Sequence, residues 1–514
     1  MCPLIYTMDT FQEHMQAVDK SLLEIPCTKA VGGDSFTQGV QDFQINIGAP
    51  SVFKPSESYF RIACTVTQGG NQPSLTTGEV ALADNFCASL YNQVSFRAGG
   101  QEVSSIQRYV GQADQIRTRI SKTKAWQESV GKNAFMIEPD YETRRQIISY
   151  EDPTVTNDGT VAVDAYGLVT GTGTDFWDSG VRVGMIMTIA AVPYVIRAIT
   201  RDADTTLTLT VPTGFTPIGA GATYTITEEE DRFESSKGRN RVYVLWKPSI
   251  GIFDNPAMLG AGQYTVSLNP NSDYKTAALQ TLTSNTDAST YNLTIDDVRF
   301  YASTYKLDKP DSEELLTLNE TDVQSKIIGD SGNVSSLQFT VPPSTYAVAV
   351  FFQSGDAGRN MINPQTLFKT QQTYPPLATD VDERSLQNIQ ITYAGMSRPA
   401  INWSNDKFTY DNTIDANTST NQLQQRYVDT INETGMIYNA GGVESFADYL
   451  KRGLFVYYEF LKDVDNKATD LQLSCNLASG LPDNTRLFVA SFYHRQVAIT
   501  NQNGLVVSVV AKSV

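Results

Sequence analysis

Residues 94–103 read VSFRAGGQEV, and this stretch carries the pattern that predicts the fold. Three apolar residues alternate with polar ones before a Gly-Gly pair, which is typical of a strand that ends in a turn. The same period of two occurs upstream, in FQINI at 43–47 and in FRIACTV at 60–66. Because alternate side chains of a strand point to opposite faces, we predict strands that each bury one face in a core.

Strand-like runs continue to the end of the chain. They lie at Val242–Trp246, Tyr264–Leu268, Leu293–Tyr301, Thr345–Phe352, Ile389–Tyr393, Leu454–Phe460, Leu471–Cys475, Leu487–Phe492 and Leu505–Val510. Helical spacing is clear at 106–120 and at 443–452. Many short strands, long polar loops and few helices indicate jelly rolls or sandwiches. The runs divide into two blocks, at 31–305 and 306–514, which we predict to be two domains.

Residues 1–30 are predicted to form an N-terminal arm. Their apolar residues recur at spacings of three and four: Met8, Phe11, Met15, Val18 and Leu22. This spacing predicts a short helix with a narrow apolar stripe. The stripe fits equally well with docking onto a neighbouring subunit and with packing on the arm's own domain.

Residues 153–230 differ in composition from the rest of the chain. They contain Gly- and Thr-rich turns, short strand-like runs and no lysine, and they end in the acidic run EEED at 228–231. We predict a small β module inserted into a loop of the first block. The acidic run could bind a cation or form a solvated linker. The linker is favoured, because adjacent carboxylates on one strand point to opposite faces and cannot close one coordination shell.

The charge balance argues against a nucleic-acid-binding protein. The chain has 39 Lys and Arg against 56 Asp and Glu, a formal net charge of −17, whereas a large nucleic-acid interface needs a dense basic footprint. One basic cluster lies on and after the predicted helix 106–120: Arg117, Arg119, Lys122 and Lys124. It could contact nucleic acid or form a solvated helix face, and the solvated face is favoured.

A search for catalytic motifs finds none. The chain has only two histidines, His14 and His494, and five cysteines without a C-x-x-C pair, which excludes a zinc site built on several histidines. It contains neither a G-x-x-x-x-G-K-[ST] loop nor a G-x-S-x-G elbow. The acidic pairs that could serve a glycosidase are Asp296/Asp297 and Asp463/Asp465. Neither pair predicts two carboxylates that face one cleft. We therefore predict that the protein is not an enzyme, and we assign no catalytic, cofactor-binding or metal-binding residue.

Several phrases, in their order along the chain, resemble double jelly-roll major capsid proteins of tailless icosahedral DNA viruses, of the Polinton-like virus and virophage type. The phrases are Val94–Val103, Trp246–Phe253, Met258–Leu268, Asn292–Leu307 and Asn363–Phe368. The resemblance extends over 31–514 except for the insert. The insert is instead similar to small β domains of phage tail and neck proteins.

The resemblance implies an all-β fold of two consecutive eight-stranded jelly rolls with short helices and a small inserted β module. It implies a major capsid protein that forms homotrimeric, pseudo-hexagonal capsomers and tiles an icosahedral shell around a DNA genome. The implied partners are other copies of the chain, penton and minor capsid proteins, and a host surface receptor bound through 153–230 on the outside. No cofactor and no sequence-specific nucleic-acid binding are expected.

The expected location is the virion. The first ten residues, MCPLIYTMDT, lack the charged and apolar regions of a secretory signal, so we expect assembly inside the host cell and no secretion. Two alternatives stay open at this point. The chain could be a receptor- or glycan-binding viral fibre, or it could be a carbohydrate-active β enzyme.

Overall fold

The structure is a computed structural model of residues 1–514, in which most of the chain can be described. The described residues are 17–29, 31–68, 80–82, 86–131, 159–174, 176, 181, 185–199, 205–212, 214–227, 241–281, 291–307, 313–328, 333–353, 386–398, 420–436, 442, 455–460, 469–477, 486–502 and 505–513. The chain divides into two compact units. One unit comprises 1–65, 79–144 and 243–514, and the other comprises 66–78 and 145–242.

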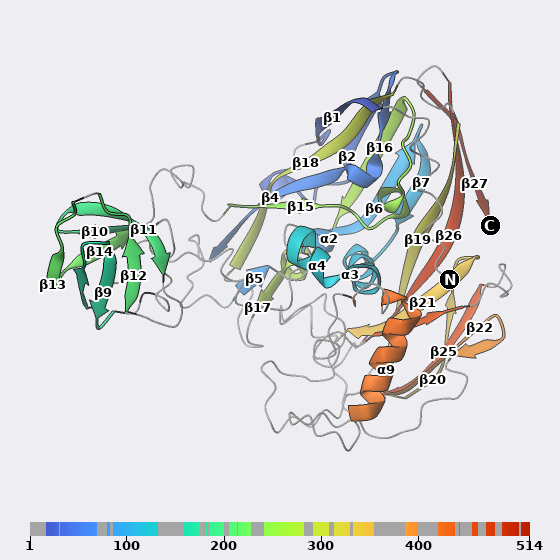
Figure 1. The fold of residues 1–514 in the computed structure, drawn as a ribbon. Helices are drawn as coiled ribbons and strands as arrows, with labels where there is room; N and C mark the ends of the chain where they lie inside the picture. The colour runs from blue at the N-terminus through green and yellow to red at the C-terminus, as the bar shows by residue number, and fades with distance from the viewer. Residues whose placement is uncertain are drawn as a thin grey trace. The chain divides into compact units, whose positions relative to one another are not determined.

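The first unit begins with a β sandwich (Figure 1). One sheet has the order β1 (Ala17–Pro26), β18 (Tyr291–Leu307), β4 (Tyr59–Gln68), β15 (Arg241–Trp246), and β3 (Ser51–Phe53) also pairs with β18. The other sheet has the order β2 (Gln41–Ile47), β16 (Gly262–Pro270), β6 (Tyr91–Ala98), β7 (Gln101–Ile106). The eight strands of these two sheets can be numbered along the chain when β3, the short β5–β17 pair and the strands of the other unit are left out. The orders are then 1-8-3-6 and 2-7-4-5. This is the topology of a jelly roll.

The second sandwich of this unit repeats the same topology. Its sheets have the orders β19 (Glu313–Ile327), β26 (Arg486–Gln502), β21 (Thr345–Gln353), β24 (Phe455–Glu459), and β20 (Asn333–Thr340), β25 (Asp470–Leu477), β22 (Leu386–Tyr393), β23 (Met396–Arg398). A C-terminal strand, β27 (Leu505–Ser513), pairs with β26. The predicted all-β fold of two eight-stranded jelly rolls is therefore confirmed.

The remaining elements of this unit are short. They are η2 (Gly33–Ser35), η3 (Pro55–Glu57), β5 (Val80–Leu82), α2 (Phe86–Ser89), α3 (Val110–Ser121), α4 (Lys124–Trp126), η4 (Gln127–Gly131), α7 (Gly251–Asp254), α8 (Tyr274–Ala278), β17 (Leu279–Thr281) and α9 (Thr420–Glu433). Within the described ranges, no helix is long and apolar enough to cross a membrane.

The core of the first sandwich is built from aromatic side chains of both sheets. Tyr91 stacks on Trp246 with ring centroids 5.5 Å apart. Phe60 lies 5.8 Å from Trp246 and 4.8 Å from Phe300. All four side chains are at most 2% exposed. Because β6 belongs to one sheet and β4, β15 and β18 to the other, these rings join the two layers, and each buried ring contributes about 1.5–3 kcal/mol.

The structure corrects the expectation for the N-terminal arm. Residues 17–26 do not form a helix; they form β1, which pairs antiparallel with β18 and is the first strand of the first jelly roll. Long-range pairing with β18 outweighs the helical spacing that Val18 and Leu22 share. Met8, Phe11 and Met15 lie outside the described residues.

The two predicted helices have different outcomes. Helix α3 exists, but it begins at Val110, because the residues up to Ile106 extend strand β7. Tyr109, in the left-handed region with φ 57°, makes the turn between the two elements. The helix predicted at 443–452 lies outside the described residues.

The described strands that lie wholly in the other unit form one seven-stranded sheet. Its order is β13 (Ile218–Ala222), β8 (Thr160–Val163), β9 (Leu168–Thr172), β12 (Thr206–Leu209), β11 (Val192–Ile199), β10 (Ile186–Ile189), β14 (Tyr224–Thr227). Its own apolar core includes Val169, Met187, Ile196 and Leu207. The longer segment of this unit, 145–242, falls between β7 and β15, the fifth and sixth strands of the first jelly roll.

Candidate assembly site between the two sandwiches

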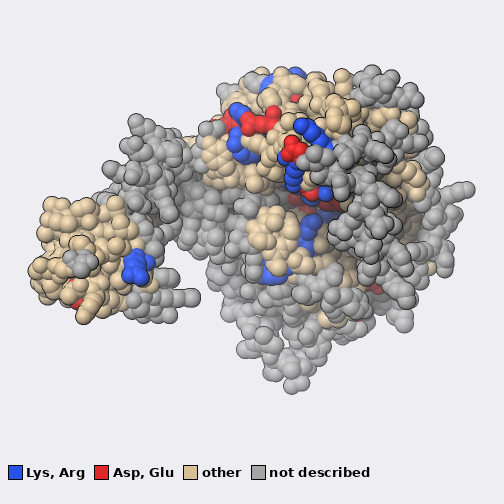
Figure 2. Space-filling model, turned by 45° about the horizontal axis from the view of Figure 1, so that its top comes forward, with Lys and Arg blue, Asp and Glu red and all other residues tan. Residues whose placement is uncertain are grey.

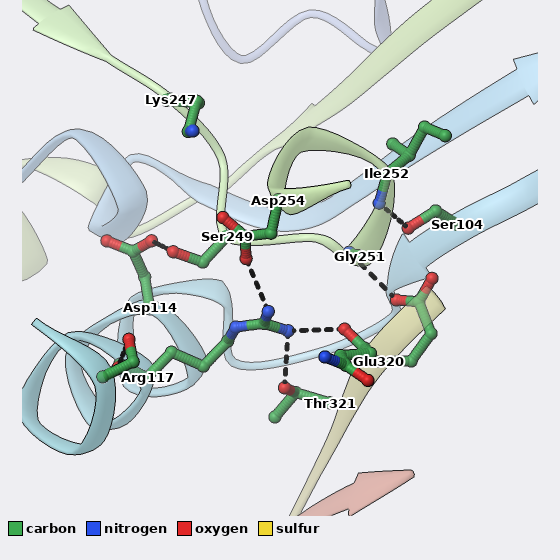
Figure 3. Close-up of polar contacts among 12 residues, drawn as sticks. Ser104, Asp114, Arg117, Lys247, Ser249, Gly251, Ile252, Asp254, Glu320 and Thr321 are labelled. Carbon is green, nitrogen blue, oxygen red and sulfur yellow. Dashed lines mark hydrogen bonds and ion pairs between the residues drawn. The ribbon is translucent and has the colours of Figure 1, made fainter. Parts of the chain in front are cut away.

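The two jelly rolls meet at one end of each. Strand β19, the first strand of the second roll, contacts α3, α7 and β7 of the first roll. Figure 3 shows this junction, with side chains from α3, α7, β7 and β19 directed toward one another. An assembly role requires the two rolls to act as one rigid body, so these contacts form the candidate functional site.

Arg117 of α3 lies at the centre of the junction. Its Nη1 donates to the carbonyl of Asn319 at 2.9 Å and to the hydroxyl of Thr321 at 3.0 Å. Its Nη2 donates to the Asp254 carboxylate at 2.6 Å, and the arginine side chain is only 12% exposed (Figure 3). For this residue, the predicted solvated helix face is wrong. The guanidinium instead joins α3, α7 and β19.

Glu320 of β19 is a buried carboxyl group at the same place. The residue is 1% exposed, and its Oε2 accepts a hydrogen bond from the backbone N–H of Gly251 at 3.4 Å. The Ser104 side chain lies near the carboxyl group, and its hydroxyl accepts from the N–H of Ile252 at 3.3 Å. Burial raises the pKa of Glu320, and the hydrogen bonds and the charge of Arg117 offset this only in part.

A pH-dependent stability follows from Glu320. Because its pKa is raised in the folded state, the unfolded chain loses this proton first, and stability falls as the pH rises above about 4.5 toward the folded-state pKa. Glu320→Gln cannot ionise, so urea unfolding at pH 4–8 should show a smaller loss of stability with pH than the wild type. The expected difference is about 1.4 kcal/mol for each unit of pKa elevation.

Glu57→Gln is the control with the opposite sign. Burial alone would raise the pKa of Glu57, but hydrogen bonds from Lys20, Lys54 and Tyr305 outweigh it and lower the pKa to about 2. The stability due to Glu57 is therefore present above about pH 4.5 and lost as the pH falls toward 2. If the stability of the wild type and of Glu320→Gln changed equally with pH, the raised pKa of Glu320 would be contradicted.

Other contacts extend the junction along β19. Asn255 Nδ2 donates to the carbonyl of Thr317 at 3.0 Å. Near the other end of β19, the hydroxyl groups of Tyr109 and Ser325 lie 2.8 Å apart, and the Tyr109 ring packs edge-on against Phe488 at 5.3 Å. Contacts therefore run along much of the strand, which favours a fixed orientation of the two rolls.

The C-terminal strand also reaches the first roll. Val506 of β27 lies against Gly99 and Gly262, where an added Cβ would approach the valine side chain to 3.0 Å. Arg495 of β26 donates to the carbonyl of Glu102 at 3.3 Å. The two glycines thus allow the backbone of the first roll to approach the last strand of the chain closely.

A pocket of about 290 Å³ lies beside the junction, between α3 and the segment after β15. Its polar groups are used in internal bonds: Asp114 accepts from Ser249, and Lys247 Nζ donates to the carbonyl of Ser56 at 3.2 Å. Lys122 lies over the Trp126 ring, 5.6 Å from its centroid. The Asp114–Ser249 pair holds α3 against the segment after β15, which is a structural role.

The structure also places three of the residues considered for chemistry. Asp296 accepts from the Thr65 hydroxyl at 2.7 Å, and Asp297 pairs with Arg299 at 2.7 Å. His494 stacks on Tyr346 with ring centroids 4.5 Å apart. The remaining candidates, which lie outside the described residues, are His14, Asp463, Asp465 and the acidic run 228–231. Among the described residues, no group of three or more His, Cys, Asp or Glu could hold a metal ion.

Comparisons with known proteins identify the fold. No family model and no curated protein matches the chain. A chain in the cryo-EM structure of the Sputnik virophage matches with a TM-score of 0.52 at 12% identity, over 97% of this chain and 89% of that one. The mavirus major capsid protein matches with a TM-score of 0.41 at 11% identity, over 100% and 95%. By its fold, shared with the Sputnik virophage chain over nearly its whole length, this chain is a double jelly-roll protein.

Proposed function

We propose that the chain is a viral major capsid protein, located in the shell of the virion. The observation that carries the proposal is the repeated jelly-roll topology, with the two rolls fixed side by side by the Arg117 and Glu320 contacts. The match to the Sputnik virophage chain over nearly the full length supports it. A coat needs rigid building blocks with large mutual contacts rather than a catalytic cleft, so the proposal includes no enzyme activity.

In this proposal the chain forms a homotrimer in which six jelly rolls make a pseudo-hexagonal capsomer. Capsomers then tile an icosahedral shell around a DNA genome, together with penton and minor capsid proteins. The domains are a first roll from β1 to β18, the inserted β unit, and a second roll from β19 to β27. In the view of Figure 2, the described basic side chains are scattered, several of them beside acidic ones, rather than gathered in one continuous patch. This supports a coat that does not itself bind the genome in a sequence-specific way.

The mass of the purified protein in solution tests the trimer. Light scattering after size-exclusion chromatography should give three times the 56.6 kDa of the chain, and negative-stain images should show particles with a hexagonal outline. A monomer at every protein concentration would contradict the proposal.

A second function, attachment to a host surface, is favoured by one feature of the seven-stranded unit. Tyr166 is 86% exposed at the turn between β8 and β9. The turn is fixed, because the backbone N–H groups of Tyr166 and Leu168 both donate to Asp164 Oδ1 at 2.8 Å. An exposed aromatic ring on a rigid turn suits recognition of a protein or glycan. Deletion of 153–230 should then abolish binding to host cells and leave the trimer intact. Unchanged binding would show that the unit has no role in attachment.

A further inference from the structure

The pocket beside the junction has the size of a small ligand site. Its lining comes from α3, α4 and η4, and from η3, the start of β4, the end of β15 and the segment after β15. All of these elements belong to one compact unit. The volume is about 290 Å³. Since one water occupies about 30 Å³ in the liquid, this space holds roughly ten non-hydrogen atoms.

Apolar and aromatic side chains form much of the lining. Trp126 and Val130 come from α4 and η4, and Tyr59 and Leu245 come from β4 and β15. Val130 is 58% exposed and Leu245 is 40% exposed. Exposed aliphatic side chains beside aromatic rings lose contact with water when an apolar group enters the pocket, which is favourable. The lining therefore suits a ligand with a hydrocarbon part.

The acids of the lining are already engaged within the protein. Glu57 forms ion pairs with two lysines, one on β1 and one just before η3. Asp254 pairs with Arg117 at 2.6 Å. Asp114, which is 5% exposed, accepts from the Ser249 hydroxyl (Figure 3). These carboxylates are therefore committed to internal partners and do not call for a cationic ligand.

The two lysines of the lining contact only neutral groups. Lys247 Nζ donates to the carbonyl of Ser56 at 3.2 Å, and Lys122 Nζ lies 5.6 Å from the centroid of the Trp126 ring. Neither lysine forms an ion pair with a carboxylate of the described residues. An ammonium group has three N–H donors, so each lysine keeps donors for an anion. Lys247 is exposed and Lys122 is partly exposed, so an ion in solution can reach both.

We propose that the pocket binds a medium-chain carboxylate. Lys122 and Lys247 hold its charged group, and its hydrocarbon chain contacts Trp126, Val130 and Leu245. A single negative charge suits this site better than a phosphate, which carries about −1.5 to −2, because the lining also contains three carboxylates. The proposal goes beyond the proposed function and does not depend on self-association.

The bound carboxylate would join two parts of the first roll. Lys122 directly follows α3, and Lys247 directly follows β15, so a ligand held by both connects the helix to the sandwich. A ligand that binds only the folded chain also stabilises it. The thermal midpoint should therefore rise as the ligand concentration rises.

The test titrates octanoate, which has ten non-hydrogen atoms, into the full-length protein and follows binding by calorimetry and tryptophan fluorescence. We expect one molecule per chain with a Kd on the order of 0.1 mM, an ordinary affinity for a ligand of this size. Acetate lacks the chain and 1-octanol lacks the charge, so each should bind about tenfold more weakly or less. Octyl phosphate keeps the chain and carries the larger charge, and it should also bind more weakly than octanoate.

Substitutions then locate the site. Lys122→Met and Lys247→Met should each weaken octanoate binding about tenfold, because each removes one charge-assisted hydrogen bond. Binding of 1-octanol should stay the same, which also shows that the variants are folded. The matched control is Lys306→Met, a lysine on β18 that pairs with Asp19 at 3.9 Å and does not line the pocket. It should leave the affinity for octanoate unchanged.

Three results would overturn the proposal. They are the absence of saturable octanoate binding, equal affinities for octanoate and 1-octanol, and wild-type affinity in both pocket variants. Tighter binding of octyl phosphate than of octanoate would overturn the choice of a carboxylate. Because binding is measured per chain, none of these results bears on the trimer, which light scattering tests separately.

Discussion

Replacing Arg117 by methionine should destabilise the two-roll unit by about 2–3 kcal/mol. Methionine keeps the aliphatic length but removes the donors to Asn319, Thr321 and Asp254. A buried charge pair that loses one partner leaves the other unpaired, which costs about 3–5 kcal/mol when burial is complete. The expected loss is smaller here because the Asp254 side chain is 33% exposed. The shift in the urea midpoint, followed by tryptophan fluorescence, measures the effect.

Lys122→Met is the control for Arg117. Lys122 lies at the end of the same helix and contacts the Trp126 ring within the first roll. Its loss should change stability by less than 1 kcal/mol, on the scale of about 0.5–1 kcal/mol for an exposed cation–π contact. Equal effects of the two substitutions would show that Arg117 does not join the rolls.

Replacing Gly251 by valine should cost about 3 kcal/mol and separate the rolls locally. A Cβ at this position would lie 2.8 Å from Glu320 Oε1, 2.9 Å from the carbonyl oxygen of Asn319 and 3.0 Å from the Cβ of Leu318. Two of these atoms belong to, or lie next to, the backbone of β19, so a side-chain rotation cannot relieve the contact. Forcing extra carbon atoms into a packed site typically costs about 1–3 kcal/mol.

Hydrogen exchange of β19 and α7 measures the separation, because amides at an opened junction exchange faster. Gly48→Val is the matched control, since a Cβ on Gly48 meets nothing within 4 Å. We expect it to change neither stability nor exchange at the junction by a measurable amount. Unchanged exchange of β19 in Gly251→Val would contradict the close packing of the rolls at this glycine.

Much of the fold could be predicted because alternation of apolar and polar residues is a local signal. The runs around Phe96, Val244, Val266 and Val489 all became strands, and their burial alternates along β2 and β15 as a half-buried strand requires. The all-β class and the two blocks followed from these runs, whereas the two eight-stranded jelly rolls were implied by the resemblance to double jelly-roll capsid proteins. This part of the fold depends on the burial of apolar side chains. The pattern of apolar residues can be read from each segment alone.

The errors lie where pairing, rather than periodicity, decides the structure. Strand β1 carries Leu22 and Leu23 side by side, so it lacks the alternation of a half-buried strand, and only its pairing with β18 makes it one. Strand β19 was not predicted either, because its residues alternate less clearly around the buried Glu320. No local pattern distinguishes such a glutamate from a solvated one.

The sequence by itself determined the class of the fold, the acidic charge and the presence of an inserted β unit, because these depend on composition and on local periodicity. Only the tertiary structure showed that Arg117 and Glu320 join the two rolls, since their partners lie about 70 to 200 residues away along the chain. It also showed that residues 17–26 pair with β18 as a strand of the first roll, and that β19 packs on α3, α7 and β7. These properties depend on contacts between residues that are far apart in the sequence. Such contacts leave no local pattern, so they can be seen only in the folded chain.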